Sequence, residues 1–383
     1  MYSKPSPCPL PRSTSAAGDS IQDPPTMNAP FQIGVTADFK VAVPGRLDAA
    51  LADLLDPLPQ VTYEYFEATG RDEQGAYVAP QDIAGYDAVL ALAARFTAAT
   101  FQPGNRLAVL ARWGVGYDNV DVPACTAADV LLAITPNAVR RPVAEAIVTL
   151  IHALSMRLYD KDRLVRTGRW NERANIPSVG LRGKTLGSIG LGNIASEMFR
   201  LLEPFGLARK LAHDPYPPAG RAAELGVELV DLPTLFRESD FVTVNCPLTE
   251  QTRGLVSSAL LDLMKPTAYL VNTARGPIVK QDDLVAALQA GRIAGAGLDV
   301  FEVEPLPTDN PLIQMDTVIL SPHALAWNDE LYYDNSVEAC QNILTVLLRG
   351  EIPQHTVNRT VVDQVDFQTK LANLRSRWQH WVV

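Results

Sequence analysis

The chain has 383 residues, of which 47% are hydrophobic and 20% charged, so it is long enough to bury two hydrophobic cores. Its formal net charge of -10 disfavours binding to nucleic-acid backbones, and no apolar run reaches the ~18–20 residues that cross a bilayer. Four widely spaced cysteines match neither a disulfide framework nor a zinc pattern, so we expect a cytoplasmic protein without a metal (Cys8, Cys125, Cys246 and Cys340).

The first 29 residues are rich in proline, serine and threonine and lack the apolar stretch of a signal peptide. This composition cannot bury enough apolar surface to order itself, and it predicts a disordered leader over residues 1–29. Met27 directly precedes the first strand-like segment, so we hypothesise that translation starts there. Finding residues 1–26 in the native protein by N-terminal mass analysis would exclude this start.

From residue 31 the chain alternates short apolar strands with amphipathic stretches, which is typical of parallel α/β units. The first series of predicted strands covers residues 31–36, 61–66, 88–92, 107–111 and 130–134. Pro136 ends this series, and Pro142 stands where we expect the next helix to begin, with a domain boundary near residue 138. The second series covers residues 185–189, 210–213, 241–245, 268–272, 294–299 and 318–320, and six strands match a dinucleotide-binding sheet.

Residues 329–348 have helical periodicity before Gly350, and we expect this helix to return to the first domain. The predicted substrate domain is therefore discontinuous (30–137 plus 326–360), with the cofactor domain, 138–325, inserted into it. Residues 361–383 form a predicted helical extension with one apolar stripe: Phe367, Leu371, Leu374, Trp378 and Trp381. Packing on its own subunit or on a dimer partner is favoured over a separate partner site.

A glycine loop follows the first strand of the second series, in the sequence from Ser188 to Ala195. Gly190 permits a tight turn, Gly192 lets the backbone approach a pyrophosphate, and Asn193 and Ile194 open a helix whose free N–H groups point at the anion. Such a loop alone could equally be a structural turn. Asp214, which closes the next strand, can accept hydrogen bonds from ribose hydroxyls and repel a 2′-phosphate, which favours NAD over NADP.

Three residues far apart in the sequence, Arg275, Glu304 and His323, each follow a predicted strand of this sheet. The carboxyl ends of parallel strands share one edge, so we expect the three side chains to gather there. A guanidinium can hold a substrate carboxylate, and an imidazole can give or take a proton near neutral pH. A carboxylate on the other ring nitrogen would fix the tautomer and stabilise the protonated ring. This set suits a 2-hydroxy acid.

The motifs around these residues resemble those of the D-isomer-specific 2-hydroxyacid dehydrogenases over about residues 30–360. They are the glycine loop, Asn245-Cys246-Pro247-Leu248-Thr249, and the stretches 271–277, 295–305 and 321–323. The resemblance implies two Rossmann-like, doubly wound parallel-sheet α/β domains, and catalytic roles for Arg275, Glu304 and His323. It also implies that Asp299 contacts the nicotinamide carboxamide and that Thr273 and Cys246 line the cofactor pocket.

Residues 112–121 resemble the substrate loop of the family, whose N–H groups, here near Val115 and Gly116, hold the substrate carboxylate. Arg95 and Arg112 fall near the phosphate-binding arginines of phosphoglycerate dehydrogenases, although surface ion pairs would explain them as well. After His323 the chain departs from the family pattern, and Trp327 is a candidate to line the substrate pocket. The resemblance also implies a homodimer.

These features favour an NAD-dependent dehydrogenase of a small D-2-hydroxy acid, such as glyoxylate, hydroxypyruvate, D-lactate or 3-phosphoglycerate as substrates in one direction or the other. The alternative from another class is an NAD-sensing regulatory protein, because corepressors resembling this family keep the same three residues. Turnover of any 2-keto acid separates the two. Formate-specific relatives carry glutamine where Glu304 stands, which argues against formate.

Overall fold

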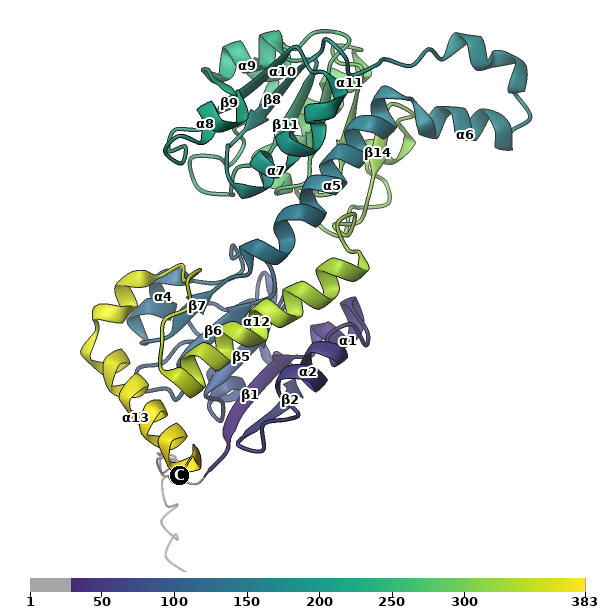
Figure 1. Ribbon diagram of the computed structural model, residues 1–383. Helices are drawn as coiled ribbons and strands as arrows, with labels where there is room; N and C mark the ends of the chain where they lie inside the picture. The colour runs from purple at the N-terminus through teal and green to yellow at the C-terminus, as the bar shows by residue number, and fades with distance from the viewer. Residues whose placement is uncertain (1–28, 383) are drawn as a thin grey trace, which may run out of the picture.

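The computed structural model describes residues 29–382, and the expected leader lies outside this part. Two parallel sheets form two bodies joined by long helices (Figure 1). The first sheet has the order β2-β1-β5-β6-β7 and confirms the first series of predicted strands. Its strands are β1 (Phe31–Thr36), β2 (Val61–Phe66), β5 (Ala88–Ala91), β6 (Val109–Arg112) and β7 (Leu131–Ala133).

The second sheet is also parallel, with the order β10-β9-β8-β11-β12-β13-β14. It contains the six predicted strands and a two-residue strand, β10, that the sequence pattern was too short to reveal. The strand order reverses beside β8, which creates the crevice where such sheets bind ligands. The strands are β8 (Thr185–Ile189), β9 (Arg209–His213), β10 (Glu228–Leu229), β11 (Phe241–Val244), β12 (Tyr269–Asn272), β13 (Gly295–Leu298) and β14 (Val318–Leu320).

Short helices cover both sheets. In the first body they are α1 (Asp38–Ala42), α2 (Asp48–Leu54), α3 (Pro80–Ile83) and α4 (Val122–Ala127), beside an antiparallel hairpin of β3 (Gly70–Asp72) and β4 (Gly75–Tyr77). In the second they are α7 (Asn193–Leu202), α8 (Arg221–Leu225), α9 (Leu232–Glu238), α10 (Ser258–Leu261) and α11 (Gln281–Gln289).

Helix α5 (Pro136–Ser155) begins earlier than predicted. Pro136 takes the first helical position, where its missing N–H is not needed, while Pro142 lies inside the helix in its second turn. The expected start at Pro142 was therefore wrong. The C-terminal half of α5 packs directly on the second sheet, because a Cβ at Gly297 would lie 3.1 Å from the Leu150 side chain.

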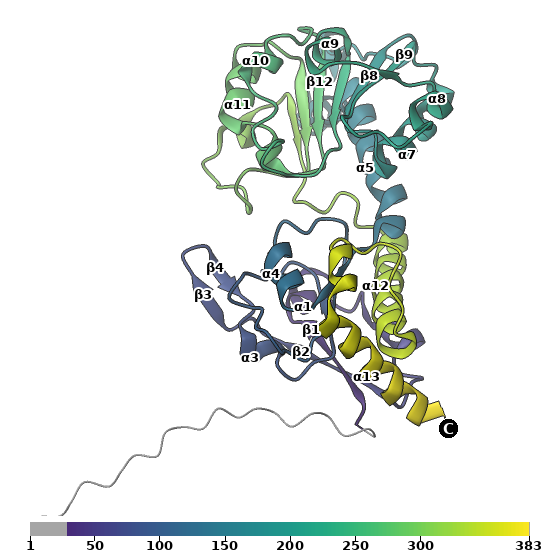
Figure 2. The same cartoon turned by 90° about the vertical axis from the view of Figure 1, so that its left-hand side faces the viewer.

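Helix α12 (Asp329–Arg349) returns to the first sheet and ends at Gly350, whose φ of 59° suits glycine, as predicted. Leu331, Ile343 and Leu347 share one hydrophobic core with the first strands of the chain. The second sheet is thus inserted into the fold of the first, while the domain limits at residues 137/138 and 325/326 stay predictions. Figure 2 shows α12 on the first body, below the second.

Helix α13 (Val365–Val382) adds the predicted apolar stripe to the same core. Phe367, Leu371 and Leu374 are buried and Trp378 packs against them, whereas the Trp381 side chain lies outside the described part. This extension packs against its own subunit (Figure 2). Among the described helices, none is both long and apolar enough to span a bilayer.

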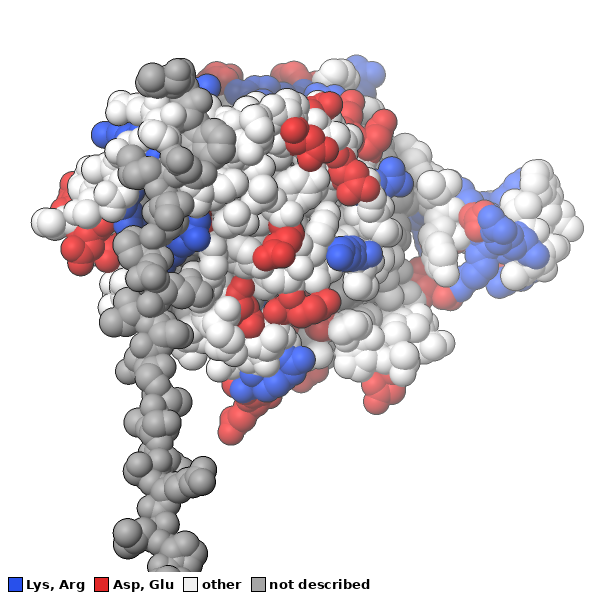
Figure 3. Space-filling view, turned by 90° about the horizontal axis from the view of Figure 1, so that it is seen from below, with Lys and Arg blue, Asp and Glu red and all other residues white. Residues whose placement is uncertain are grey.

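A protruding arm, residues 156–180, leaves the second body after α5 (Figure 1). It contains α6 (Leu158–Arg166) and the 3-10 turn η1 (Trp170–Asn175). Leu158, Tyr159 and Trp170 expose more than half of their surface on it. Figure 3 shows a group of basic side chains on this arm, whereas the charged side chains over the rest of that face are scattered among uncharged ones.

Candidate active site

A cavity of about 560 Å³ lies between the two bodies. The first body contributes the loop that follows β6, and the second contributes the loops that follow β11, β12, β13 and β14. All of these loops leave the carboxyl ends of parallel strands, where α/β sheets bind their ligands. The fold therefore brings chemically active residues from the whole chain to one place.

The glycine loop fits a dinucleotide. Gly190 has a φ of 98°, and a Cβ there would lie 2.9 Å from the Asn245 carbonyl oxygen, so only glycine suits this turn. A Cβ at Gly192 would meet no atom within 4 Å, which leaves open space above the start of α7 for a pyrophosphate. The helix begins at Asn193 with no capping side chain, so its first N–H groups are available to an anion.

Asp214 directly follows β9, beside this loop. Its carboxylate accepts hydrogen bonds from the backbone N–H groups of Leu191 and Tyr216, both at 2.8 Å. The acid is therefore fixed next to the turn, where the ribose of a bound dinucleotide would lie. Ile194, from the first turn of α7, lines the cavity and connects the loop with it.

The other expected cofactor residues, Cys246, Thr273 and Asp299, all line the cavity. Burial raises the pKa of the Cys246 thiol to about 11, so it stays protonated at neutral pH. The Asp299 carboxylate accepts from the N–H groups of Ala324 and Leu325 at 3.1 and 3.2 Å. Asp299 thus holds the backbone that directly follows His323, an additional function that the sequence did not reveal.

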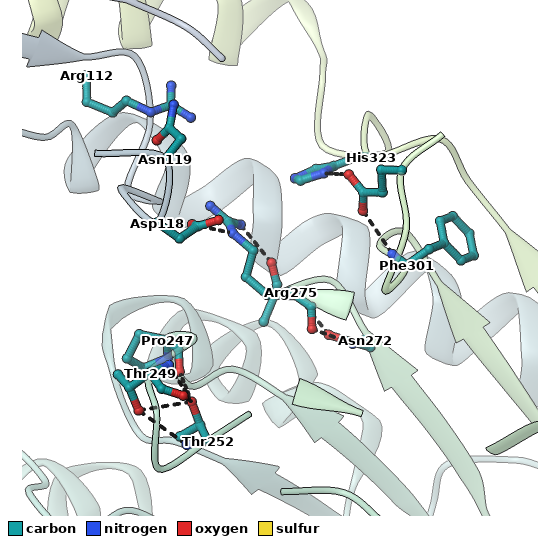
Figure 4. Close-up of polar contacts among 12 residues, drawn as sticks. Arg112, Asp118, Asn119, Pro247, Thr249, Thr252, Asn272, Arg275, Phe301 and His323 are labelled. Carbon is teal, nitrogen blue, oxygen red and sulfur yellow. Dashed lines mark hydrogen bonds and ion pairs between the residues drawn. The ribbon is translucent and has the colours of Figure 1, made fainter. Parts of the chain in front are cut away.

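His323 and Glu304 form a pair beyond the carboxyl ends of β13 and β14. The imidazole Nδ1 lies 2.8 Å from a Glu304 oxygen, and the other oxygen accepts from the Phe301 N–H at 2.9 Å. Burial alone would raise the pKa of Glu304, but the bonds from His323 and Phe301 and the charge of Arg275 hold this pKa below its usual value. Glu304 therefore stays ionised, and the Nε2 of His323 is left for the cavity (Figure 4).

Arg275 follows β12 and lies across from His323. Asn272 fixes the backbone there, since its amide donates to the Arg275 carbonyl and accepts from the Ala274 N–H, both at 3.0 Å. The guanidinium Nε donates to Asp118 at 2.8 Å, and Nη1 donates to the Ala274 carbonyl at 2.8 Å (Figure 4). Asp118 belongs to the first body, so this contact crosses the cavity.

The substrate loop meets the same guanidinium. A Cβ at Gly116 would lie 1.3 Å from Nη2 of Arg275, so the side chain rests on the bare backbone of this glycine. Val115 and Gly116 both line the cavity. Arginine and the loop therefore face one shared space, as expected for two groups that bind the same carboxylate.

Comparison with known proteins identifies the family. The D-isomer specific 2-hydroxyacid dehydrogenase NAD-binding domain matches residues 148–324. A glyoxylate reductase from Korarchaeum cryptofilum is 39% identical over 268 residues, which cover 69% of this chain and 80% of the relative. The chain belongs to the D-isomer-specific 2-hydroxyacid dehydrogenases. It is thus an NAD-binding oxidoreductase that acts on CH–OH groups.

Two further relatives of this dehydrogenase family differ in substrate. A D-3-phosphoglycerate dehydrogenase from Synechocystis sp. is 35% identical over 81% of this chain, which corresponds to 54% of that relative. The solved D-mandelate dehydrogenase from Rhodotorula graminis is 28% identical, with a TM-score of 0.71 over 86% of this chain and 98% of its own. Family membership therefore leaves the individual acid open.

The two candidate phosphate-binding arginines of this dehydrogenase have different surroundings. Arg95 is not among the residues that line the cavity and is held by Asp72 at 2.8 Å and by Gln74 at 2.9 Å. Its role in substrate binding stays a prediction, to which the lining of the cavity adds no support. Arg112 lines the cavity, and burial together with the charge of Arg275 lowers its pKa to about 10. It has no ion-pair partner among residues 29–382, and its buried Nε has no hydrogen-bond partner there.

Trp327 also lines the cavity of the dehydrogenase, at its first-body side. It packs edge-to-face against Trp113, with ring centroids 6.4 Å apart, and against Tyr332 at 6.2 Å. Trp113 is buried and donates its indole N–H to Ser336 at 3.0 Å. This aromatic wall was only partly expected, since the sequence does not show that Trp113 and Trp327 meet.

Sequence reasoning missed Asp118, which lies two residues after Gly116 in the substrate loop. Its place in the substrate loop, between Tyr117 and Asn119, was the only sign of a role in the site. The sequence does not indicate which loop faces Arg275. The Asp118 carboxylate pairs with the guanidinium of Arg275 across the cavity, a contact that the sequence did not predict.

Proposed function

We propose that this dehydrogenase reduces a small 2-keto acid to its D-2-hydroxy acid and catalyses the reverse reaction, with NAD as the cofactor. One observation carries the proposal: Arg275 and His323 line the same cavity, and Glu304 stands behind the imidazole. A carboxylate-binding group and a proton donor are thus available to the two ends of one 2-keto acid.

Each residue has a distinct role in this proposal. The Arg275 guanidinium and the N–H groups near Val115 and Gly116 bind the substrate carboxylate. His323, oriented by Glu304 through Nδ1, gives its Nε2 proton to the carbonyl oxygen during reduction and takes it back during oxidation. Bound NADH supplies the hydride. Arg275 also stabilises the negative charge that develops on the oxygen.

The candidate substrates are glyoxylate, hydroxypyruvate, and 3-phosphohydroxypyruvate with its reduced form, 3-phosphoglycerate. Support for a second anionic group comes from Arg112, a half-buried arginine at the cavity with no acidic partner in the described part of the chain. Support for a phosphorylated substrate also comes from the similarity to phosphoglycerate dehydrogenases, and for glyoxylate from the similarity to glyoxylate reductases.

The test is the loss of NADH absorbance with glyoxylate, hydroxypyruvate, pyruvate, phenylpyruvate and 3-phosphohydroxypyruvate, repeated with NADPH. Turnover with NADH and at least one keto acid is the expected result. A protein that binds NADH but reduces none of these acids would contradict the proposal and favour an NAD-sensing regulatory protein. Arg112→Leu is the variant that sorts the substrates, because it should weaken turnover of the phosphorylated acid far more than that of glyoxylate.

A further inference from the structure

Asp118 occupies the substrate-facing edge of Arg275. A guanidinium can bind a carboxylate with two parallel bonds along the edge formed by Nε and Nη2. Here Nε donates to Asp118 at 2.8 Å, and Nη2 lies over Gly116. The edge next to the substrate loop therefore already holds a carboxylate, and that carboxylate belongs to the protein (Figure 4).

The pair is placed so that it can open. The Asp118 side chain is 43% exposed and that of Arg275 is 23% exposed, so water can solvate Asp118 when it leaves. The remaining bond of the guanidinium, from Nη1 to the neighbouring Ala274 carbonyl, keeps Arg275 in place without Asp118. An incoming carboxylate that uses Nε and Nη2 must therefore displace Asp118 rather than Arg275.

Asp118 competes as an anion. Burial raises its pKa, but the charge and the hydrogen bond of Arg275 outweigh this effect, with a smaller contribution from Arg112, and hold the pKa below its usual value. The two cations that face it come from different elements, the end of β6 and the loop after β12. Only a ligand that brings its own negative charge can replace it without leaving Arg275 unpaired.

We propose that Asp118 is a specificity-determining residue that stands in for the substrate carboxylate on Arg275 until the substrate displaces it. This inference rests on the proposed role of Arg275 as the carboxylate anchor. It implies that the free enzyme discriminates against uncharged analogues, such as amides and esters of the keto acid, because these cannot compensate Arg275 once Asp118 has moved away.

The experiment measures binding of oxamate, an unreactive keto-acid analogue, to the protein saturated with NADH, together with the kinetics of the best keto acid. For Asp118→Asn we expect the oxamate Kd to fall roughly two- to fivefold, the range of a partly exposed ion pair. KM of the keto acid should fall in parallel, so that the change lies in KM rather than in kcat. Asp118→Glu keeps the charge and should tighten oxamate binding less than Asp118→Asn does. Glu73→Gln, at an exposed residue that does not line the cavity, is the control and should leave the oxamate Kd unchanged. Asp118→Ser serves the same test should the asparagine variant not fold.

A double-mutant cycle separates displacement from simple charge repulsion. In an Arg275→Ala background, Asp118→Asn should leave the oxamate Kd unchanged, because there is no pair to break. An unchanged or weaker oxamate affinity in Asp118→Asn, or equal tightening in the Arg275→Ala background, would overturn this proposal alone. Absence of both oxamate binding and keto-acid turnover in the original protein would overturn the proposed function and this inference with it.

Discussion

At the residue scale, the side chains of the site are oriented by backbone groups as well as by one another. Asp299 holds the two N–H groups that follow His323, and the Phe301 N–H holds Glu304. Because these anchors lie at strand ends, the imidazole is oriented before any substrate arrives. Preorganisation of this kind is what gives a proton donor its catalytic value.

Replacing His323 by alanine tests the proton donor. The variant should lose roughly 10²- to 10⁴-fold in kcat, the usual contribution of a general acid, while its NADH affinity stays the same. Steady-state kinetics and NADH fluorescence titration measure the two quantities. His355→Gln is the control, because His355 does not line the cavity and should keep full activity. Near-normal kcat in His323→Ala would remove this residue from the mechanism.

Replacing Arg275 by alanine tests the carboxylate anchor. We expect kcat/KM to fall roughly 30-fold or more, because a partly buried charged partner of the substrate is lost. NADH binding should remain intact, since the guanidinium contacts Asp118 and the substrate loop rather than the glycine loop. An unchanged kcat/KM in this variant would refute the role, and a weakened NADH affinity would show that Arg275 serves the cofactor instead.

The residue scale also marks the limit of sequence reasoning. Arg275, Glu304 and His323 lie in distinctive motifs, so their types and positions could be predicted without coordinates. Asp118 and the pairing of Arg95 with Asp72 could not, because both depend on which loop faces which across more than one element. The partner of a charge is a property of the fold, whereas the charge itself is a property of the sequence.

At the element scale, α13 is attached to the first sheet by a buried ion pair as well as by its apolar stripe. Arg377, which is only 5% exposed, donates to Asp87 at 2.7 Å. Asp87 also binds Arg106 at 2.6 Å and accepts from the Gln32 N–H at 2.8 Å. This carboxylate therefore joins α13, the start of β5 and the first strand.

Arg377→Met should lower the free energy of unfolding by about 2–4 kcal/mol, because it removes one of the two cations that compensate a buried carboxylate. Urea unfolding measures this change. Ser376→Ala, on the exposed side of the same helix, is the control and should change stability by less than about 0.5 kcal/mol. If Arg377→Met also changed the free energy of unfolding by less than about 0.5 kcal/mol, its ion pair with Asp87 would contribute little to the stability of the first body.

Lys370, on the same helix, should make the free energy of unfolding depend on pH. Its ammonium group donates to the carbonyls of Leu107, Ala128 and Asp129 at 2.9–3.1 Å, and burial lowers its pKa from 10.5 to about 8. Between about pH 8 and 10.5 the unfolded chain therefore binds more protons than the folded one, so this lysine makes stability rise with pH in that window.

The measurement compares the original protein with Lys370→Met by urea unfolding at pH 7.5 and pH 10. Comparing the two proteins at each pH cancels the titration of the groups that they share. The free energy of unfolding of the original protein, relative to that of the variant, should increase by roughly 1–3 kcal/mol between the two pH values. A pH-independent difference would show that the three carbonyls keep the ammonium group charged despite its burial.

The elements themselves followed from the sequence where the apolar runs were long. Strands of four to six residues were predicted within one or two residues, because fully buried parallel strands form continuous apolar segments. The hairpin β3–β4 and the two-residue β10 were missed, since such short polar segments carry no periodic signal. The predicted start of α5 was wrong because Pro136 was interpreted as the end of the strand series, whereas it is the first residue of the helix.

At the scale of the whole molecule, the cavity exists only because the chain leaves the first body and returns to it. Helix α5 carries the chain out and α12 carries it back, and Glu338 of α12 binds the Ala138 N–H of α5 at 2.9 Å. Both connections therefore pass through one packed pair of helices. The same two helices line the cavity, through Val139 and Val143 of α5 and Leu331 and Asn335 of α12.

The protruding arm is a candidate contact surface between two copies of the chain. Leu158 and Trp170 are 61% and 60% exposed on a segment that packs on little of its own body, which is costly for a monomer in water. We propose that a second copy of the chain covers the arm. The family resemblance implies a homodimer but does not indicate the arm as the contact. Light scattering coupled to gel filtration should then give the mass of two chains.

The double variant Leu158→Asp with Trp170→Ser should elute as a single chain, because two large apolar side chains leave the contact and a charge enters it. Val365→Ser is the matched control, since Val365 is 78% exposed on α13, far from the arm in the sequence, and should leave the assembly intact. A single-chain mass for the original protein at micromolar concentration would contradict the dimer. If the double variant also stayed dimeric, the contact would lie on another face of the molecule.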